Sequence, residues 1–90
     1  MMNVSYVAHI SGKVQGVYFR ASSQQMAIEC SLSGYAHNLP DGDVEVLLCG
    51  DEKNVDKMLD WLNHGPPSAK VSKIKTKKVP WQDHNHFSIG

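Results

Sequence analysis

The sequence predicts an α+β fold in which two helices cover one face of an antiparallel-rich sheet. Three observations lead to this prediction. Apolar and polar residues alternate in several short segments, apolar residues recur at helical spacing in two others, and turn-forming glycines and prolines separate them. The chain has 90 residues, of which 41% are hydrophobic and 20% charged. This is the size and composition of one globular domain, which we expect to span residues 1–90.

The first part of the chain predicts a strand, a loop and a helix. The period-2 alternation that indicates the strand covers about residues 4–11. Glycines at positions 12 and 16 then indicate a loop, and from about residue 18 the apolar spacing becomes helical up to about residue 32. Gly34 is a plausible stop for this helix. The apolar positions are Val4, Tyr6, Ala8 and Ile10 in the strand, and Phe19, Met26, Ala27 and Cys30 in the helix.

The second part predicts a hairpin, a second helix and two further strands. A short strand at about residues 35–38 leads into a Leu-Pro-Asp-Gly turn, and Val44, Val46 and Leu48 mark the returning strand. Asp51 is a suitable cap for a helix that the Gly-Pro-Pro at 65–67 ends. A fourth strand is expected within residues 69–79 and a weak last strand at about 86–89. The apolar stripe of the second helix is Val55, Met58, Leu59 and Leu62.

The resulting order, β-α-β-β-α-β with a short extra strand, is that of the split β-α-β, or ferredoxin-like, arrangement. In this arrangement the first and second strands run parallel and the third lies between them. Their carboxyl ends therefore open on the same edge of the sheet, about 10 Å apart at roughly 4.8 Å per strand. We expect the loop after the first strand and Asn38, at the end of the second, to share this edge.

Charge, targeting and cysteine content narrow the classes of function. Nine basic and nine acidic residues cancel, so the chain lacks the overall basic field that drives non-specific nucleic-acid binding. No segment resembles a signal peptide or a membrane span, so we expect a cytoplasmic protein with no membrane partner. Cys30 and Cys49 match no metal-binding spacing. We interpret them as buried free thiols in a reducing compartment.

The segment from Gly12 to Arg20 has the features of an anion-binding loop. It joins a strand to a helix start, where main-chain N–H groups lack intrahelical partners. It is neither a Walker loop nor a Gly-x-Gly-x-x-Gly loop, and two glycines alone are more typical of a turn without a ligand. Arg20 adds a cation in the first helical turn, and no acidic residue follows before Glu29. A bound oxyanion would complement it, although an Arg that extends into solvent is an open alternative.

Asn38 begins the turn sequence Asn-Leu-Pro-Asp-Gly. Considered alone, it is typical of a side chain that caps a hairpin turn. The predicted topology nevertheless places it on the same edge as Arg20. Its amide can both donate and accept, so it could hold a water molecule there without changing the charge of the site.

The two segments together resemble the acylphosphatase family. Residues 10–20, ISGKVQGVYFR, match the first signature of that family, and residues 34–44, GYAHNLPDGDV, with Gly50, resemble the second. The Gly-Pro-Pro-Ser-Ala at 65–69 is also similar. The resemblance covers the chain from about Val4 to its end. His37, where the family more often has Lys or Arg, and the end of the chain at Ser88-Ile89-Gly90, without the usual Arg or Tyr, are departures.

The resemblance implies the ferredoxin-like fold and an enzyme that hydrolyses small acyl phosphates. It implies that Arg20 is the catalytic arginine and that Asn38 orients the attacking water. It also implies that the family needs no metal or other cofactor and forms no phosphoenzyme, and that inorganic phosphate or sulfate binds like a product. We expect a monomer. The residues implied to bind phosphate are Gln15, Gly16, Val17, Tyr18, Phe19 and Arg20.

The residue types agree with this chemistry. A carboxylate leaving group has a conjugate-acid pKa near 4 and departs unprotonated, so neither an acid nor a metal is required. We see no His–Asp pair, paired carboxylates or metal-ligand cluster in the signatures. What remains is to position water in line and to stabilise the equatorial oxygens. The alternative function is a non-catalytic ferredoxin-like module that binds an anion or RNA; strand aromatics for base stacking are few beyond Tyr6 and Tyr35.

Two other patterns have plainer interpretations. His84 and His86, with Asp83, could suggest a metal site, but two His on a short strand are more often solvated. A basic segment in the fourth strand could bind RNA, but lysines that protect an exposed sheet edge explain it better. The lysines are Lys70, Lys73, Lys75, Lys77 and Lys78.

Overall fold

The computed structural model describes residues 2–82 and 84–89. Its elements follow the predicted order, with a fifth strand at the end. The strands are β1 (Asn3–Lys13), β2 (Ser33–Asn38), β3 (Val44–Asp51), β4 (Lys70–Val79) and β5 (Phe87–Ile89), and the helices are α1 (Phe19–Glu29) and α2 (Glu52–Leu62).

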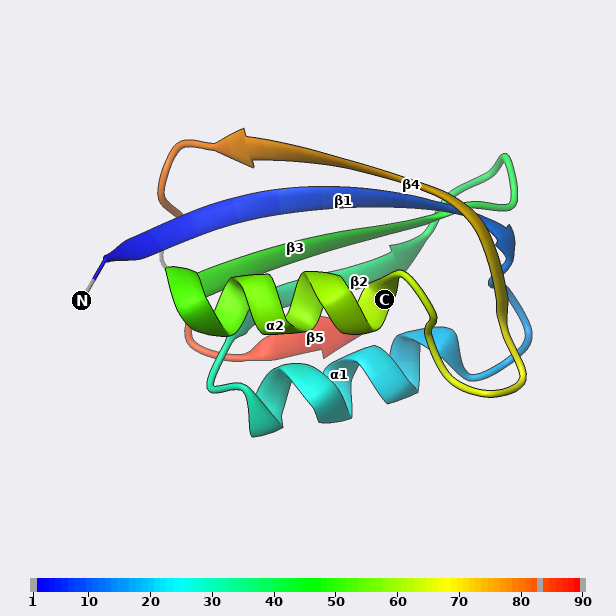
Figure 1. Cartoon of the computed structure of the whole chain (residues 1–90), viewed down its shortest axis with the longest axis horizontal. Helices are drawn as coiled ribbons and strands as arrows, with labels where there is room; N and C mark the ends of the chain where they lie inside the picture. Colours follow the sequence, from blue (N-terminus) through cyan, green and yellow to red (C-terminus); the bar gives the residue numbers. More distant parts are fainter. Residues whose placement is uncertain (1, 83, 90) are drawn as a thin grey trace.

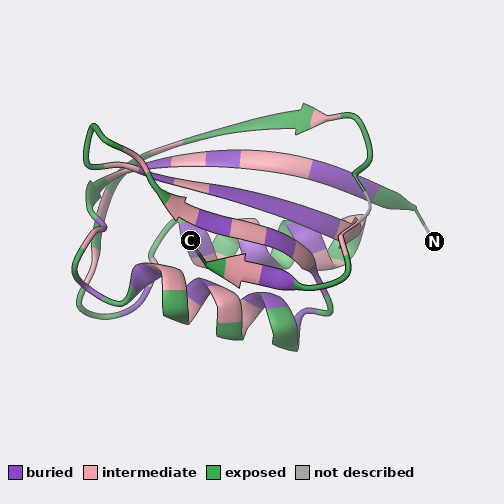
Figure 2. Ribbon diagram, turned by 180° about the vertical axis from the view of Figure 1, so that it is seen from behind, coloured by how far each residue is buried: buried purple, intermediate pink, exposed green. Residues whose placement is uncertain are grey.

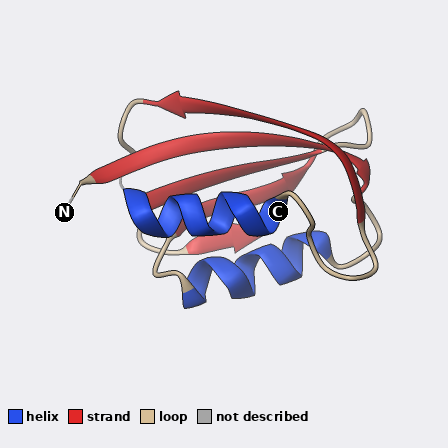
Figure 3. Ribbon diagram, in the orientation of Figure 1, coloured by secondary structure: helices blue, strands red, loops and turns tan. Residues whose placement is uncertain are grey.

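The five strands form one sheet in the order β4-β1-β3-β2-β5. Figure 1 shows α1 and α2 side by side in front of this sheet, and Figure 3 shows that both helices lie on the same face. The predicted ferredoxin-like arrangement, with two helices on one face, is therefore confirmed. One pair differs from an all-antiparallel sheet, because β2 and β5 run parallel.

The strand register brings the ends of β1 and β2 to one edge. Both strands pair antiparallel to β3, which lies between them, so they run parallel to each other as predicted. In Figure 1 the carboxyl ends of β1, β2 and β5 point the same way, toward the start of α1. This edge, which we call the site edge, therefore receives the loop after β1, the N-terminus of α1, the end of β2 and the end of β5.

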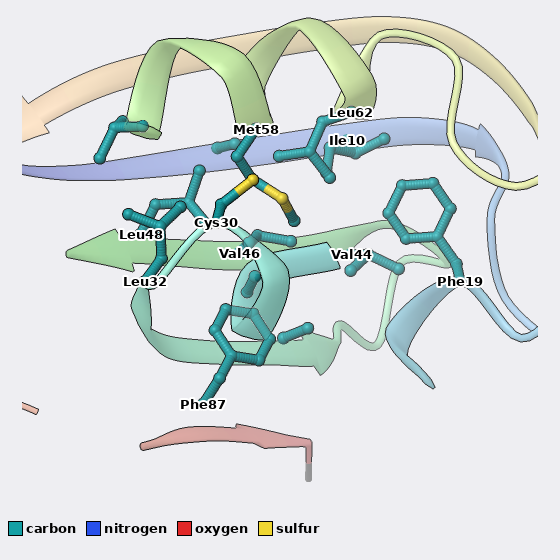
Figure 4. Packing of buried hydrophobic residues seen from close by; sticks show 14 of the residues in the cluster. Ile10, Phe19, Cys30, Leu32, Val44, Val46, Leu48, Met58, Leu62 and Phe87 are labelled. Carbon is teal, nitrogen blue, oxygen red and sulfur yellow. The ribbon is translucent and has the colours of Figure 1, made fainter. Parts of the chain in front are cut away.

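The core lies between the sheet and the helices. Figure 4 shows residues from both helices and from several strands packed together in this layer, with Phe19 and Leu62 toward one end of it and Phe87 of the last strand at its border. Val4, Ala8 and Ile10 face this layer, as their alternation predicts. The predicted cap of α2 is also present, since the Asp51 carboxylate accepts a hydrogen bond from the Lys53 N–H at 2.9 Å.

One end of the opposite, open face of the sheet is less exposed to solvent than the alternation suggests. Ser5 lies on this face but is fully buried, because the segment after β4 covers it. The Gln82 N–H donates to Ser5 Oγ at 3.0 Å, and Ser5 Oγ donates to Cys49 Sγ at 3.2 Å. Cys30 and Cys49 are both buried and free, as predicted. Figure 2, from this side, shows β4 exposed along the edge of the sheet.

Candidate active site

A cavity of about 320 Å³ opens at the site edge. It brings together Arg20 and Asn38, the two residues that the sequence predicts to act on phosphate and water, although 17 positions separate them in the chain. The topology explains this, because Arg20 lies in the first turn of α1 and Asn38 ends β2. The cavity is lined by Val14, Gly16, Tyr18, Phe19, Arg20, Ala21, Asn38 and Ile89.

The main chain of the loop has a conformation suited to holding an anion. Gly16 (φ 72°) and Tyr18 (φ 61°) both lie in the left-handed region, which few non-glycine residues adopt. Tyr18 is the N-cap of α1, its side chain makes no capping hydrogen bond, and the first turn holds no acidic residue. The first N–H groups of α1 thus have no intrahelical acceptor and carry partial positive charge. Phe19, Arg20 and Ala21 of this turn line the cavity.

The loop is fastened from behind by three contacts. The Val17 carbonyl accepts a hydrogen bond from Ser68 Oγ at 2.9 Å. The ring of Phe19 is 1% exposed and packs against Trp61, with ring centroids 6.1 Å apart. Val14 and Val17 are buried as well. A loop held in this way needs little rearrangement when a ligand arrives.

Gln15 joins the loop to the β2–β3 hairpin. Its side-chain Nε2 donates to the carbonyls of Leu39 and Asp43, both at 2.9 Å. Of the six residues that the sequence predicts to bind phosphate, Gly16, Tyr18, Phe19 and Arg20 line the cavity, and Gln15 and Val17 do not. Their side chains instead hold the loop in place: that of Gln15 on the hairpin and that of Val17 within the core.

Asn38 is exposed at the end of β2, directly opposite Val44. The turn that follows has its own cap, because the Asp41 carboxylate accepts a hydrogen bond from the Asp43 N–H at 2.9 Å. The role of an Asx-type cap, which the turn sequence suggests for Asn38, therefore belongs to Asp41. Asn38 instead lines the cavity with Arg20.

The cavity has an apolar wall that the sequence did not predict. Tyr18 is 82% exposed and Ile89 is 41% exposed, and both large side chains line the cavity. Ile89 reaches the cavity because β5 pairs parallel to β2. It lies opposite Ala36, which is two residues before Asn38 on β2. The alternation of Phe87 and Ile89 indicates this strand. Its parallel pairing with β2, which brings Ile89 to the cavity, is a tertiary contact that the alternation does not predict.

The structure forms a His–Asp pair between Asp43 of the second signature and a histidine outside both signatures. His9 lies on β1, one residue before the first signature, and its Nε2 is 2.6 Å from Asp43 Oδ2. Ser11 Oγ donates to the same oxygen at 3.0 Å, and the hydrogen bond from His9 is the main cause that lowers the pKa of Asp43. Sequence spacing could not show this pair, because the pairing of β1 with β3 brings positions 34 residues apart together.

This pair belongs to a separate hollow of about 250 Å³ on the open face of the sheet. His9, Asp41 and Asp43 could each offer a ligand atom to a metal, since these atoms lie within 4.8 Å of one another. Two lysines line the same hollow and would oppose a divalent cation electrostatically. The hollow is lined by His9, Ser11, Asp43, Lys73 and Lys75.

The structure also locates the histidines near the end of the chain and the lysines of the fourth strand. His84 Nε2 lies 3.3 Å from the side-chain oxygen of Gln82, and His86 is exposed; Asp83 lies outside the described residues. The lysine-rich β4 is an edge strand, as its composition indicates, and all five lysines are exposed. Neither helix in the described part of the chain has the length and apolarity needed to span a bilayer.

The sequence of this chain is similar to those of known proteins. The family model Acylphosphatase matches residues 6–89. The chain is 76% identical over 89 residues to an acylphosphatase of Colwellia psychrerythraea, covering 99% of this chain and 100% of that relative. It is 47% identical over 76 residues to an acylphosphatase of Aeromonas salmonicida, covering 84% of each chain.

Solved structures show the same fold. An acylphosphatase from Coxiella burnetii superposes with a TM-score of 0.94 at 36% identity, covering 98% of this chain and 93% of that one. The acylphosphatase from Bacillus subtilis superposes with a TM-score of 0.93 at 33% identity, covering 99% of both chains. These similarities extend over nearly the whole chain, and they include both segments that form the cavity.

Proposed function

This chain belongs to the acylphosphatase family and is an enzyme that hydrolyses acyl phosphates, and from this premise we propose how the cavity at the site edge performs the reaction. The observation that carries the proposal is the meeting of Arg20, the N-terminus of α1 and Asn38 around one cavity. In the proposed mechanism Arg20 and the loop amides hold the phosphate, and Asn38 orients water for in-line attack on phosphorus.

Arg20 and the main-chain donors of residues 15–20 provide the phosphate site. A guanidinium binds phosphate oxygens in pairs, and the helix N-terminus adds partial positive charge. The left-handed conformations of Gly16 and Tyr18 bend the loop around the cavity that this charge faces. These donors stabilise the three equatorial oxygens as the bond to the leaving carboxylate breaks.

Asn38 orients the attacking water and neither gains nor loses a proton. Its amide accepts from and donates to a water molecule, so it can aim the water at phosphorus while its charge stays constant. The leaving carboxylate needs no general acid, because it is stable as an anion at neutral pH. The His9–Asp43 pair is therefore not required as an acid, and it lies in the hollow on the other face of the sheet.

The apolar wall favours substrates with an apolar acyl group. Tyr18 and Ile89 expose large side chains at a cavity whose polar groups are taken by the phosphate and the water. An aromatic acyl group, such as benzoyl, would bury part of this surface, whereas an acetyl group would bury little.

The alternative, a non-catalytic module that binds RNA or an anion, has less support. Tyr6, one of two strand aromatics considered for base stacking, packs against the core on the helix side of the sheet. Tyr35, the other, stacks on His37 with ring centroids 4.2 Å apart. Retention of RNA at physiological salt without turnover of benzoyl phosphate would favour this alternative.

The proposed mechanism is tested with two substitutions and benzoyl phosphate as substrate, in the presence of a chelator. Arg20→Ala should lower turnover by at least about one to two decades, because a charge-assisted hydrogen bond contributes roughly 1.5–3 kcal/mol. The same change should weaken inhibition by inorganic phosphate. Asn38→Ala should lower turnover but leave phosphate inhibition nearly unchanged, since it acts on the water.

The matched control for Arg20→Ala is Lys70→Ala, which removes an exposed cation of β4 that does not line the cavity. It should keep both turnover and phosphate inhibition. Equal phosphate inhibition of the wild type and Arg20→Ala would show that the phosphate site lies elsewhere. Activity that the chelator abolishes would contradict a metal-independent mechanism.

We also propose that the chain forms one domain and acts as a monomer in the cytoplasm. One core cluster that draws residues from Val4 to Phe87 supports the single domain. Two buried free thiols support a reducing compartment. The exposed lysines on the edge strand β4 oppose pairing with a second copy and support the monomer.

A further inference from the structure

Two sets of hydrogen bonds meet at Asp43, the residue just before β3. Its main-chain carbonyl accepts from the Leu39 N–H at 2.8 Å and from Gln15 Nε2 at 2.9 Å. Its carboxylate Oδ2 accepts from His9 Nε2 at 2.6 Å and from Ser11 Oγ at 3.0 Å. Asp43 thereby ties the hairpin both to the phosphate loop and to strand β1.

The hairpin position of Asn38 depends on these bonds. Asn38 pairs with Val44 in register, and the residues just beyond this pair, Leu39 and Asp43, are joined by the 2.8 Å main-chain bond. Any movement of Asp43 relative to β1 would therefore shift the end of β2. The loop and Arg20 are also held by contacts outside the hairpin, at Ser68 and at the ring of Phe19, so such a shift would change the distance between Asn38 and the phosphate.

The surroundings of Asp43 keep its carboxylate in place as an anion. The side chain is 21% exposed, and the hydrogen bonds from His9 and Ser11 hold its pKa below the ordinary value. Lysines of β4 supply positive charge on the same hollow. The charged groups that face the His9–Asp43 pair are Asp41 of the turn, Glu45 of β3, and Lys73 and Lys75 of β4.

We propose that Asp43 is a positioning residue for hydrolysis: it anchors the β2–β3 hairpin to β1 through His9 and Ser11, and so sets the place of the Asn38 amide over the phosphate loop. This rests on the proposed role of Asn38. The effect falls on turnover more than on binding, because the loop keeps its contacts with Ser68 and Trp61, and because Gln15 bonds to the main-chain carbonyl of Asp43, which a side-chain substitution leaves in place.

The test measures kcat, KM and phosphate inhibition with benzoyl phosphate at a temperature where circular dichroism shows every variant folded. Asp43→Ala should lower kcat about tenfold, because small misplacements of a catalytic group are costly, while KM and phosphate inhibition change less than about twofold. Asp43→Asn keeps one acceptor oxygen and should recover part of the loss. Adding His9→Ala to Asp43→Ala should cost little more, because both changes break the same link.

The matched control is Glu45→Ala. Glu45 is a carboxylate on the same face of β3, two residues along, and it accepts a 2.7 Å hydrogen bond from the Tyr35 hydroxyl but none from the loop or from β1 among the described contacts. Its kcat should stay within about twofold of the wild type, as expected for a surface change away from the site.

The outcomes separate the two proposals. If Asp43→Ala lowers kcat no more than Glu45→Ala, or raises KM as much as it lowers kcat, the positioning role is wrong. If Asn38→Ala, measured beside them, leaves kcat unchanged, the proposed function itself fails. If Asn38→Ala lowers kcat and the Asp43 variants do not, only the positioning role is overturned. Should Asp43→Ala not fold, Asp43→Asn and Ser11→Ala carry the same comparison.

Discussion

Arg20 occupies a place that helix electrostatics alone would not favour. A cation in the first turn of α1 faces the positive end of the helix macrodipole, which prefers an anion by roughly 0.3–1 kcal/mol. The side chain is half-buried and lines the same cavity as the first main-chain N–H groups. A phosphate dianion in that cavity would stabilise both kinds of charge at once. The unfavourable placement of this single residue is thus consistent with binding of substrate.

At the same scale, Asp43 predicts a pH dependence of stability. Its pKa in the folded protein is lowered from the ordinary 3.8, first by the hydrogen bond from His9. A lowered carboxyl pKa stabilises the folded state above the ordinary value, and this contribution is lost as the pH falls through the folded pKa. Asp43→Asn should therefore be less stable than the wild type at neutral pH, and the difference should shrink below about pH 4.

Urea unfolding of both proteins between neutral pH and about pH 3 measures this difference. A gap in the free energy of unfolding that stays constant over the whole range would show that the Asp43 carboxylate is not stabilised by His9 and Ser11. A gap that widens toward acid would contradict the sign of the pKa shift.

At the scale of elements, the close approach of neighbouring strands depends on particular glycines. Gly34 in β2 has φ 137°, and a Cβ there would lie 1.9 Å from the Leu47 carbonyl oxygen on β3. Gly42 in the β2–β3 turn also has a positive φ, 94°, but a Cβ there would meet nothing within 4 Å. The two positions separate the cost of backbone conformation from the cost of a clash between strands.

We expect Gly34→Ala to destabilise the protein by at least about 3 kcal/mol, since it combines backbone strain with a main-chain clash in the central sheet. Gly42→Ala, the matched control, should cost only about 1 kcal/mol, because it adds strain alone. Chemical denaturation of the two variants gives both values. Similar losses for both would mean that β2 and β3 can separate to admit the methyl group.

At the scale of the whole molecule, one layer of core connects the site to the far end of the chain. Phe19 from the start of α1, Met58 and Leu62 from α2, and Phe87 from the last strand belong to the same cluster. Cys30 is part of this cluster, whereas Cys49 is buried on the open face beside Ser5. The two thiols therefore lie on opposite faces of the sheet, which explains why they remain free.

This arrangement predicts slow thiol chemistry in the folded protein. Cys49 is 1% exposed, and burial raises its pKa, so little reactive thiolate is available. Alkylation of both cysteines in native buffer should be at least about 100-fold slower than in guanidinium, because it requires local or global opening. In guanidinium without reductant, both cysteines of each chain should react. A lower count would reveal a disulfide, and fast native labelling would show that the covering segment after β4 opens readily.

The sequence by itself determined the order and kind of the elements, the loop expected to hold phosphate and the two residues expected to act on it. These features depend on local physics: period-2 and helical spacing, turn residues, a helix start and a cation in its first turn. The two signatures are local as well. The family resemblance could therefore be recognised from two short segments, residues 10–20 and 34–44.

The tertiary structure alone decided the contacts that the order of the elements does not contain. Parallel pairing of β2 and β5 brought Ile89 to the cavity, and the register of β1 with β3 brought His9 to Asp43. Gln15 acts through a side chain that holds the hairpin rather than by lining the cavity. Such contacts join positions far apart in the chain and depend on strand register, which the periodicity of a single segment does not contain.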